Sequence, residues 1–361
     1  MKRQLIALFS AAVMIAGSSA RVQAAGSQKT LVVTMTNDPN NNAVIVVDAA
    51  TQTRRQTLST NGKGGVSGNN RGLKQYQDQL FAAVNYRSGT VAVFQRVGDQ
   101  LALQQTVVTS SPPVSVDFAN GHMYVAGDTT ADSFILDGSR VGVLDGSARL
   151  VLAGGGIPVS GDTAQVSAAD AKTLLVSIKT DPTPGTMDVV PLNPNGAISG
   201  TPAAVSAPPG SLTPFGFSVY PDGTAVITLA HSSQLGLFRN NSFVGVVPAG
   251  QAADCWTTRI GKYVLVVNTG SQTISRVLGT GSNIFVDSSV VTRIVTGNPT
   301  DTDAAGGYLG VIDKGTGAGA HLTLFTYNDF AELSPSGTLN LGNIAPNGVA
   351  IMTPAQFEDE D

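Results

Sequence analysis

The chain is dominated by short segments in which apolar residues either run continuously or alternate with polar ones. The clearest unit lies at residues 79–108: the apolar run QLFAAVN, the polar corner YRSG, the alternating segment TVAVFQR and then LALQQTVV. A continuous apolar run indicates a strand covered on both faces, whereas alternation indicates a half-buried strand. The pattern therefore predicts a unit of antiparallel strands and no long helix.

The same unit recurs along the chain. Polar corners follow an apolar run at Asn37, Asn85, Asp128, Thr180, His231, Asn268 and Asp313, with a mean spacing of about 46 residues. Four strands in such a period are typical of one β-propeller blade, and propellers have about 4 to 8 blades. The predicted fold is an all-β, seven-bladed β-propeller of four-stranded antiparallel blades.

The two ends of the repeat indicate how the ring closes. The first unit lacks its innermost strand, while the C-terminal segment APNGVAIMTP (345–354) resembles TPFGFSVYPDG (213–223), the innermost strand of a later unit. We therefore expect the strand from Asn347 to Met352 to pair with the strand from Leu31 to Thr36. Such closure removes exposed edge strands, which favour aggregation.

The first residues form a separate unit. Lys2 and Arg3 precede an apolar run that is too short to span a bilayer, and small residues follow it, as in a secretory signal peptide. We predict a signal peptide at 1–24, with Ala20 and Ala25 as alternative cleavage points, a single propeller at 25–355 and an acidic disordered tail at 356–361. The protein is predicted to be secreted or periplasmic.

Composition supports this assignment and excludes some functions. The chain has 41 glycines and 13% charged residues, which favours strands and turns over solvent-facing helices. Removing residues 1–24 takes away three basic residues, so the net charge falls from −4 to −7. That charge argues against nucleic-acid binding, and no later segment predicts membrane insertion after signal cleavage. Cys255 is the only cysteine, so no intrachain disulfide can form.

Three segments resemble a known family: FAAVNYRSGTVAVFQ, FSVYPDGTAVITLAHSSQLGLF and YVLVVNTGSQTISRV. They are similar to the lactonase-type seven-bladed propellers, which include 6-phosphogluconolactonases and carboxymuconate cyclases. The resemblance implies the propeller fold and a lactone or small organic acid as ligand. The cyclases use a histidine, a glutamate and arginines. The matching segment here, GIPVSGDTAQVSAAD, has no histidine, and the first glutamate is Glu332. No catalytic residue is transferred from the family.

Candidate catalytic residues come from the loops that lead into the innermost strands and from the corners between second and third strands. These two sets open on the same face of a propeller, where loops from several blades meet. Arg71 can clamp a carboxylate or phosphate, His231 is the candidate acid or base, and Asp254 is an orienting or polarising partner. Alternatively, Arg71 ties neighbouring blades together and His231 binds a local backbone group.

Further ligand-binding candidates share that face. They are Asn85, Tyr86, Lys179, Phe215, Trp256, Asp301 and Asp303. Trp256 is the only tryptophan and can stack on a ring or an acyl chain, or it can wedge between sheets.

A metal site is a further hypothesis. Asp162, Asp254 and Asp301 are candidate calcium ligands, since calcium prefers several oxygen ligands; no other cofactor is expected. Cys255 is interpreted as a small buried hydrophobe, because no histidine is close to it in sequence.

The sequence is compatible with two functions. The first is a secreted lactonase-like propeller, a lactone hydrolase or muconate cyclase-like enzyme, that acts on or binds a small organic acid or lactone. The alternative is a non-enzymatic propeller that binds a small ligand or an exported protein partner, with Tyr86, Phe215 and Trp256 as contacts.

Overall fold

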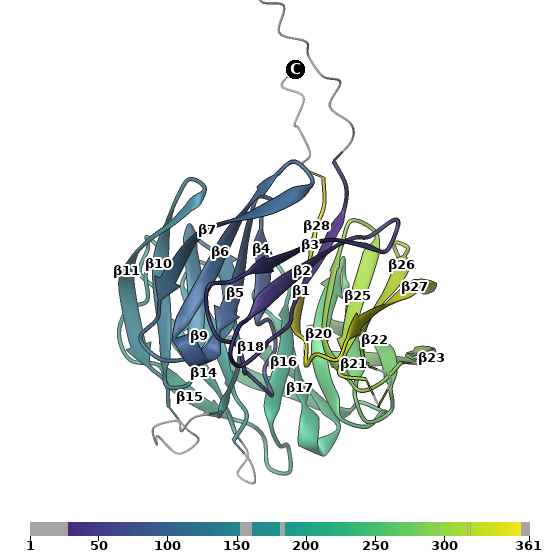
Figure 1. Ribbon diagram of the computed structural model, residues 1–361. Coiled ribbons are helices and arrows are strands. Elements are labelled where there is room, and N and C mark those ends of the chain that lie inside the picture. Colours follow the sequence, from purple (N-terminus) through teal and green to yellow (C-terminus); the bar gives the residue numbers. More distant parts are fainter. Residues whose placement is uncertain are drawn as a thin grey trace, which may run out of the picture.

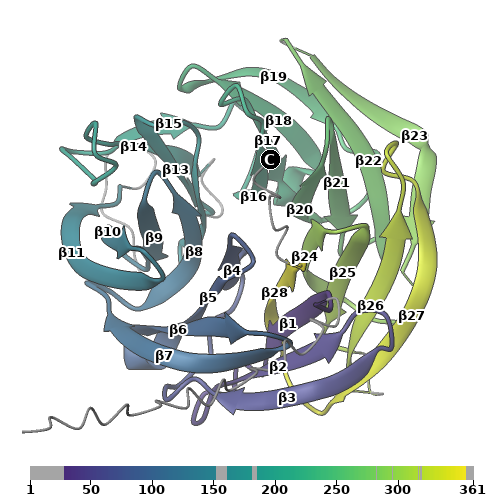
Figure 2. The same ribbon diagram turned by 90° about the horizontal axis from the view of Figure 1, so that it is seen from above.

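The computed structural model describes residues 28–151, 161–180, 185–281, 283–294, 296–315, 317 and 319–354. The predicted signal peptide and acidic tail lie outside the described residues. Among the described residues, strands form seven separate four-stranded antiparallel sheets, which confirms the predicted fold class. Figure 2 shows these sheets as blades around a common axis.

Each blade runs from the axis outwards in four positions. The innermost strands are β28 (Asn347–Met352), β4 (Leu73–Tyr76), β8 (Pro113–Ala119), β12 (Thr163–Ala168), β16 (Pro214–Val219), β20 (Asp254–Ile260) and β24 (Pro299–Ala305). The second strands are β1 (Leu31–Met35), β5 (Leu80–Asn85), β9 (His122–Gly127), β13 (Thr173–Ile178), β17 (Ala225–Leu229), β21 (Tyr263–Asn268) and β25 (Tyr308–Asp313). Every predicted polar corner lies at or just after the end of a second strand.

Two further positions complete the blades. The third strands are β2 (Ala43–Asp48), β6 (Thr90–Val97), β10 (Thr130–Asp137), β14 (Thr186–Pro191), β18 (Gln234–Arg239), β22 (Thr273–Thr280) and β26 (Ala320–Tyr327). The outermost strands are β3 (Thr53–Ser59), β7 (Gln100–Val108), β11 (Arg140–Arg149), β15 (Ala203–Ser206), β19 (Ser242–Pro248), β23 (Asn283–Arg293) and β27 (Leu333–Gly342). The only described helices are two short 3₁₀ turns, η1 (Tyr86–Ser88) and η2 (Ala230–Ser232).

The ring closes as predicted. β28 pairs antiparallel with β1, from Leu31 opposite Met352 to Met35 opposite Asn347, and Figure 1 shows the two strands side by side. One blade is therefore built from both ends of the chain, and β1 has a strand partner on each side, β2 and β28.

Burial follows the blade positions. The second strands are almost entirely buried, as predicted from their apolar runs. The third strands are more buried than their alternation suggests; β2 is buried at all but its first residue. The reason is that neighbouring blades pack on both faces of each sheet. Alternation of burial appears instead on the outermost strands, such as β3, whose outer edge faces solvent. Within the described residues, no helix has the length and apolar character of a membrane span.

Candidate functional site

The channel along the axis has two ends. We call the end where the innermost strands begin the proximal end and the end where they finish the distal end. The sequence places the candidate site at the proximal end. Residues 69–72, here named the axial segment, lead into β4 and lie across that end of the channel.

Hydrogen bonds fix the axial segment to the surrounding blades. The Asn69 side chain donates to the Val114 carbonyl of β8 at 2.7 Å, and the Asn70 amide donates to the Ala164 carbonyl of β12 at 2.9 Å. The Trp256 indole of β20 donates to the Asn69 carbonyl at 3.1 Å. Asn69 and Asn70 are buried. Since buried polar groups need such partners, these bonds specify the path of the segment.

A glycine in β16 makes room for this arrangement. A Cβ on Gly216 would lie 2.7 Å from the side-chain nitrogen of Asn70 and 2.3 Å from the Cys255 carbonyl oxygen. Because Gly216 has no side chain, the Asn70 side-chain amide has room to donate to Gln165 Oε1 at 2.6 Å. The proximal end is thus filled by protein rather than open to a ligand along the axis.

Arg71 extends from the filled proximal end of the channel toward its distal end. Its backbone is in the left-handed region (φ 55°), an uncommon conformation for a residue other than glycine. Its amide donates to Asp301 Oδ2 at 3.2 Å. Its guanidinium reaches the opposite wall, where Nη1 donates to Ser167 Oγ at 3.0 Å and lies 4.0 Å from Asp117 Oδ1.

The distal end contains a cavity of about 430 Å³ on the axis, here named the axial cavity. Six of the innermost strands contribute to its wall. The polar side chains that line it are Arg71, Lys74, Asp117, Ser167, Ser218, Thr258, Arg259 and Asp303. Three basic and two acidic groups therefore converge on one space, whose volume is in the usual range of small-molecule sites.

The acidic groups are held by hydrogen bonds. Asp117 Oδ2 accepts the Ser167 hydroxyl at 2.8 Å and the Ala168 amide at 3.1 Å. Asp303 Oδ2 accepts the Ile351 amide at 2.9 Å, which ties it to the closing strand β28. Such bonds fix the orientation of both carboxylates before a ligand arrives.

The structure brings some of the predicted residues together and separates others. Arg71 and Asp303 line the axial cavity, and Asp301 lies directly behind Arg71. Burial raises the pKa of Asp301 to about 7. Asp254 is buried at the start of β20, where burial raises its pKa to about 8. His231 is exposed on η2 and is not among the described residues that line the axial cavity.

The remaining candidates pack at the proximal end. Phe215 and Trp256 are both 7% exposed and meet edge to face, with ring centroids 5.7 Å apart. The Lys179 ammonium lies 5.8 Å from the Phe215 ring centre and donates to the Gly68 carbonyl; burial lowers its pKa to about 8. The Tyr86 hydroxyl donates to Asp128 Oδ2 at 2.8 Å.

Asn85 and the candidate calcium ligands do not line the axial cavity. Asn85 is buried and donates to the Thr60 carbonyl at 3.3 Å, so it fastens a loop. The candidate calcium ligands Asp162, Asp254 and Asp301 are not brought together. Across the described residues, no group of three or more His, Cys, Asp or Glu side chains is arranged to hold a metal ion.

Sequence reasoning missed Lys74, Asp117, Ser167 and Arg259. All four lie within an innermost strand, whereas the sequence predicts site residues in the loops and corners. A signal was present: the segments VSVDFA and AQVSA each place a polar residue, Asp117 or Ser167, near the end of a strand that is buried along almost its whole length. In a sheet covered on both faces, such a residue needs a polar surrounding, and the axis supplies it.

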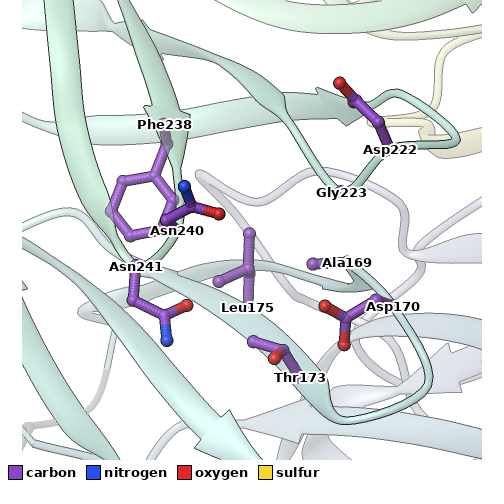
Figure 3. Close-up of a pocket in the computed structure, with 9 residues that line it drawn as sticks. All are labelled: Ala169, Asp170, Thr173, Leu175, Asp222, Gly223, Phe238, Asn240 and Asn241. Atoms are coloured by element: carbon purple, nitrogen blue, oxygen red, sulfur yellow. The ribbon is translucent and has the colours of Figure 1, made fainter.

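A second cavity lies away from the axis. It has a volume of about 300 Å³ and opens between the blades of β13 and β18. Figure 3 shows Leu175 and Phe238 in its floor, with Asp170, Asn240 and Asn241 around them.

This geometry defines the class of protein: a seven-bladed propeller with a polar cavity at one end of its axis. No family model matches the sequence, and no curated protein matches it. Solved structures with this fold include the periplasmic gluconolactonase of Pseudomonas aeruginosa, with a TM-score of 0.64 and 15% identity over 91% of this chain and 100% of that one. A candidate 6-phosphogluconolactonase from Bacteroides fragilis has a TM-score of 0.62 and 15% identity over 90% and 98% of the two chains. A virginiamycin B lyase from Staphylococcus aureus has a TM-score of 0.53 and 12% identity over 79% and 92%. The chain therefore has the lactonase-type propeller fold.

Proposed function

We propose that the axial cavity binds a small lactone and hydrolyses it to the hydroxy acid. The observation that carries this proposal is the convergence of Arg71, Lys74 and Arg259 with Asp117 and Asp303 around one cavity. Lactone hydrolysis develops negative charge on the carbonyl oxygen and yields a carboxylate, and both are stabilised by basic groups.

Each residue then has a definite role. Arg71 and Lys74 face the lactone carbonyl and stabilise its oxygen as water adds to the carbon. Asp303 accepts a proton from that water, since its carboxylate is oriented by the Ile351 amide. The ring C–O bond breaks, and the alkoxide takes up the proton that Asp303 accepted, which gives the hydroxyl of the product. The new carboxylic acid releases its proton to solvent and becomes a carboxylate. Arg259 holds the new carboxylate.

The sequence adds a location to this proposal. The predicted signal peptide at 1–24 supports secretion or a periplasmic site of action, and the name of the Pseudomonas aeruginosa neighbour is in keeping with it. The substrate would then be an extracytoplasmic lactone of a small organic acid.

The test is a hydrolysis assay by pH-stat with a panel of five- and six-membered lactones. Arg71→Ala and Asp303→Asn should each lower kcat/KM about 100-fold or more, the usual cost of removing an oxyanion-stabilising group or a general base. Arg149→Ala and Asp137→Asn are matched controls, since both residues are exposed on β11 and β10. Absence of turnover by the natural chain, or full activity of both cavity variants, would overturn the proposal.

A second candidate is binding without catalysis, to a small ligand or an exported protein. It is favoured by the Arg71, Ser167 and Asp117 network, whose members already satisfy one another. It is favoured also by the position of His231 outside the cavity wall. Calorimetric binding of a hydroxy acid, lost in Arg71→Ala and unaccompanied by lactone turnover, would support this candidate.

A further inference from the structure

A third cavity adjoins the axial cavity. It has a volume of about 480 Å³ and lies between the blades of β16–β19 and β20–β23. Its walls come from the turn after β16, the turn after β20 and the last residues of β22. It opens at the distal end, as the axial cavity does. We call it the lateral cavity.

Tyr220 and Pro221 line both cavities and form the wall between them. The position of Tyr220 is fixed, because its hydroxyl oxygen accepts the Gly279 amide of β22 at 2.9 Å. Position 279 has little room for a side chain, since a Cβ there would lie 3.1 Å from the Tyr220 ring. The wall is thus held in place between the two blades, and both cavities border the same residue pair.

The lateral cavity differs chemically from the axial one. Tyr220, Pro221 and Leu278 give it apolar surface. Lys262 adds its methylene stem, since its ammonium lies 5.2 Å from the centre of the Tyr263 ring. Asp222 at the rim accepts the Thr224 amide of its own turn at 3.0 Å. An apolar cavity that lies beside a site for a polar head group is suited to bind an alkyl chain.

The alternative route from the axial cavity leads to the cavity of Figure 3, which shares Ala169 with it. That space is bordered by Asp170, Thr173, Asn240 and Asn241, whose carboxylate, hydroxyl and amide groups would lose water against an alkyl chain. The lateral cavity is therefore the favoured path for an apolar substituent.

We infer that the ligand of the axial cavity is amphipathic: a lactone, or its hydroxy acid, that carries an alkyl tail which passes Tyr220 and Pro221 into the lateral cavity. This inference rests on the proposed function and extends it to a substrate class. The head is bound by the basic residues of the axial cavity, and the tail loses water in the lateral cavity.

The experiment uses a series of δ-lactones that differ only in the length of a straight 5-alkyl tail, from methyl to nonyl, and the corresponding hydroxy acids. Dissociation constants are measured by calorimetry with the hydroxy acids, and KM values with the lactones. In the natural chain, each added methylene should tighten binding about two- to fourfold until the lateral cavity is full, as expected for burial of a methylene group.

Thr280→Trp fills the lateral cavity from its exposed rim. Its matched control is Asp137→Trp, because both residues end a third strand and precede a left-handed glycine, Gly281 or Gly138. Thr280→Trp should keep the affinity for the methyl compound and lose the gain with tail length, whereas Asp137→Trp should retain that gain. Melting temperatures of both variants verify that they fold.

Each other outcome counts against the inference in a distinguishable way. If affinity is independent of tail length while the methyl compound still binds, the lateral subsite is overturned and the proposed function stands. If Thr280→Trp retains the full gain with tail length, or weakens all members equally, the tail does not occupy this cavity. If no member binds the natural chain, both the inference and the proposed function fail.

Discussion

Asn69 and Asn347 exchange hydrogen bonds through their side-chain amides. Asn347 donates to Asn69 Oδ1 at 2.7 Å, and Asn69 donates to Asn347 Oδ1 at 3.2 Å. Asn69 belongs to the axial segment and Asn347 begins the closing strand β28. Two segments 278 residues apart in sequence are therefore joined on the axis, where both side chains are buried.

The first prediction concerns this pair. Asn69→Ala removes both hydrogen bonds with Asn347 and the hydrogen bond to the Val114 carbonyl. Because buried polar groups are then left without partners, the substitution should lower the free energy of unfolding by about 1–3 kcal/mol. Urea unfolding measures the change, with Asn283→Ala as control, because Asn283 is an exposed residue of β23. A double-mutant cycle with Asn347→Ala isolates the pair, and additive effects would show that the two residues do not couple.

The fold could be predicted from the sequence because it depends on local pattern. Apolar runs, polar corners and the spacing between them indicated the blades. The similarity of residues 345–354 to residues 213–223 indicated the closing strand. Burial of the third strands was underestimated, because alternation alone does not show that neighbouring blades cover both faces of β2.

The second prediction tests ring closure. Ala350→Asp introduces a carboxylate into β28 opposite Val33, at a position with no exposure. Because an unpaired buried charge is strongly unfavourable, this variant should lose several kcal/mol of stability, about 3 or more, or fail to accumulate in folded form. The matched control is Ala203→Asp on the outermost strand β15, where residue 203 is exposed and should tolerate the change. Equal melting temperatures for the two variants would contradict the role of β28.

The site was less predictable than the fold. The loops and corners predict a site at the proximal end, and of the three predicted catalytic residues only Arg71 lines the axial cavity. What the sequence does not show is the path of residues 69–72 across the axis, since that path depends on bonds to Val114, Ala164 and Trp256 far along the chain. The sequence prediction does not include Asp117 and Ser167, because it places catalytic groups in loops and these two residues lie within strands.

The third prediction concerns the dependence of stability on pH. Burial raises the pKa of Asp188 to about 7, of Asp254 to about 8 and of Asp301 to about 7. In the unfolded chain these carboxyls titrate near their ordinary value of about 3.9. The folded state therefore binds more protons between about pH 4 and pH 8, so the free energy of unfolding falls as the pH rises through that window.

Thermal unfolding measures this effect. The melting temperature should be higher near pH 5 than near pH 8, because the buried carboxyls are protonated in the folded state at the lower value. Asp254→Asn removes one of these titrating carboxyls and should reduce the difference in melting temperature between about pH 5 and about pH 8. A melting temperature that rises from about pH 5 to about pH 8 would contradict the prediction.

The fourth prediction concerns Cys255, which lies beside Trp256 in β20. Its side chain is only partly exposed, and burial raises the pKa of the thiol to about 12. Since the thiolate is the reactive form, alkylation of the folded protein by iodoacetamide near pH 8 should be about 100-fold or more slower than alkylation of the same chain in concentrated urea. Mass spectrometry follows the added group, and Trp256 fluorescence verifies that the fold persists. The Cys255→Ser variant shows how much labelling arises elsewhere. Equal rates in the two states would show that the thiol is activated in the fold and would contradict its interpretation as a buried packing residue, whereas slow labelling supports that interpretation.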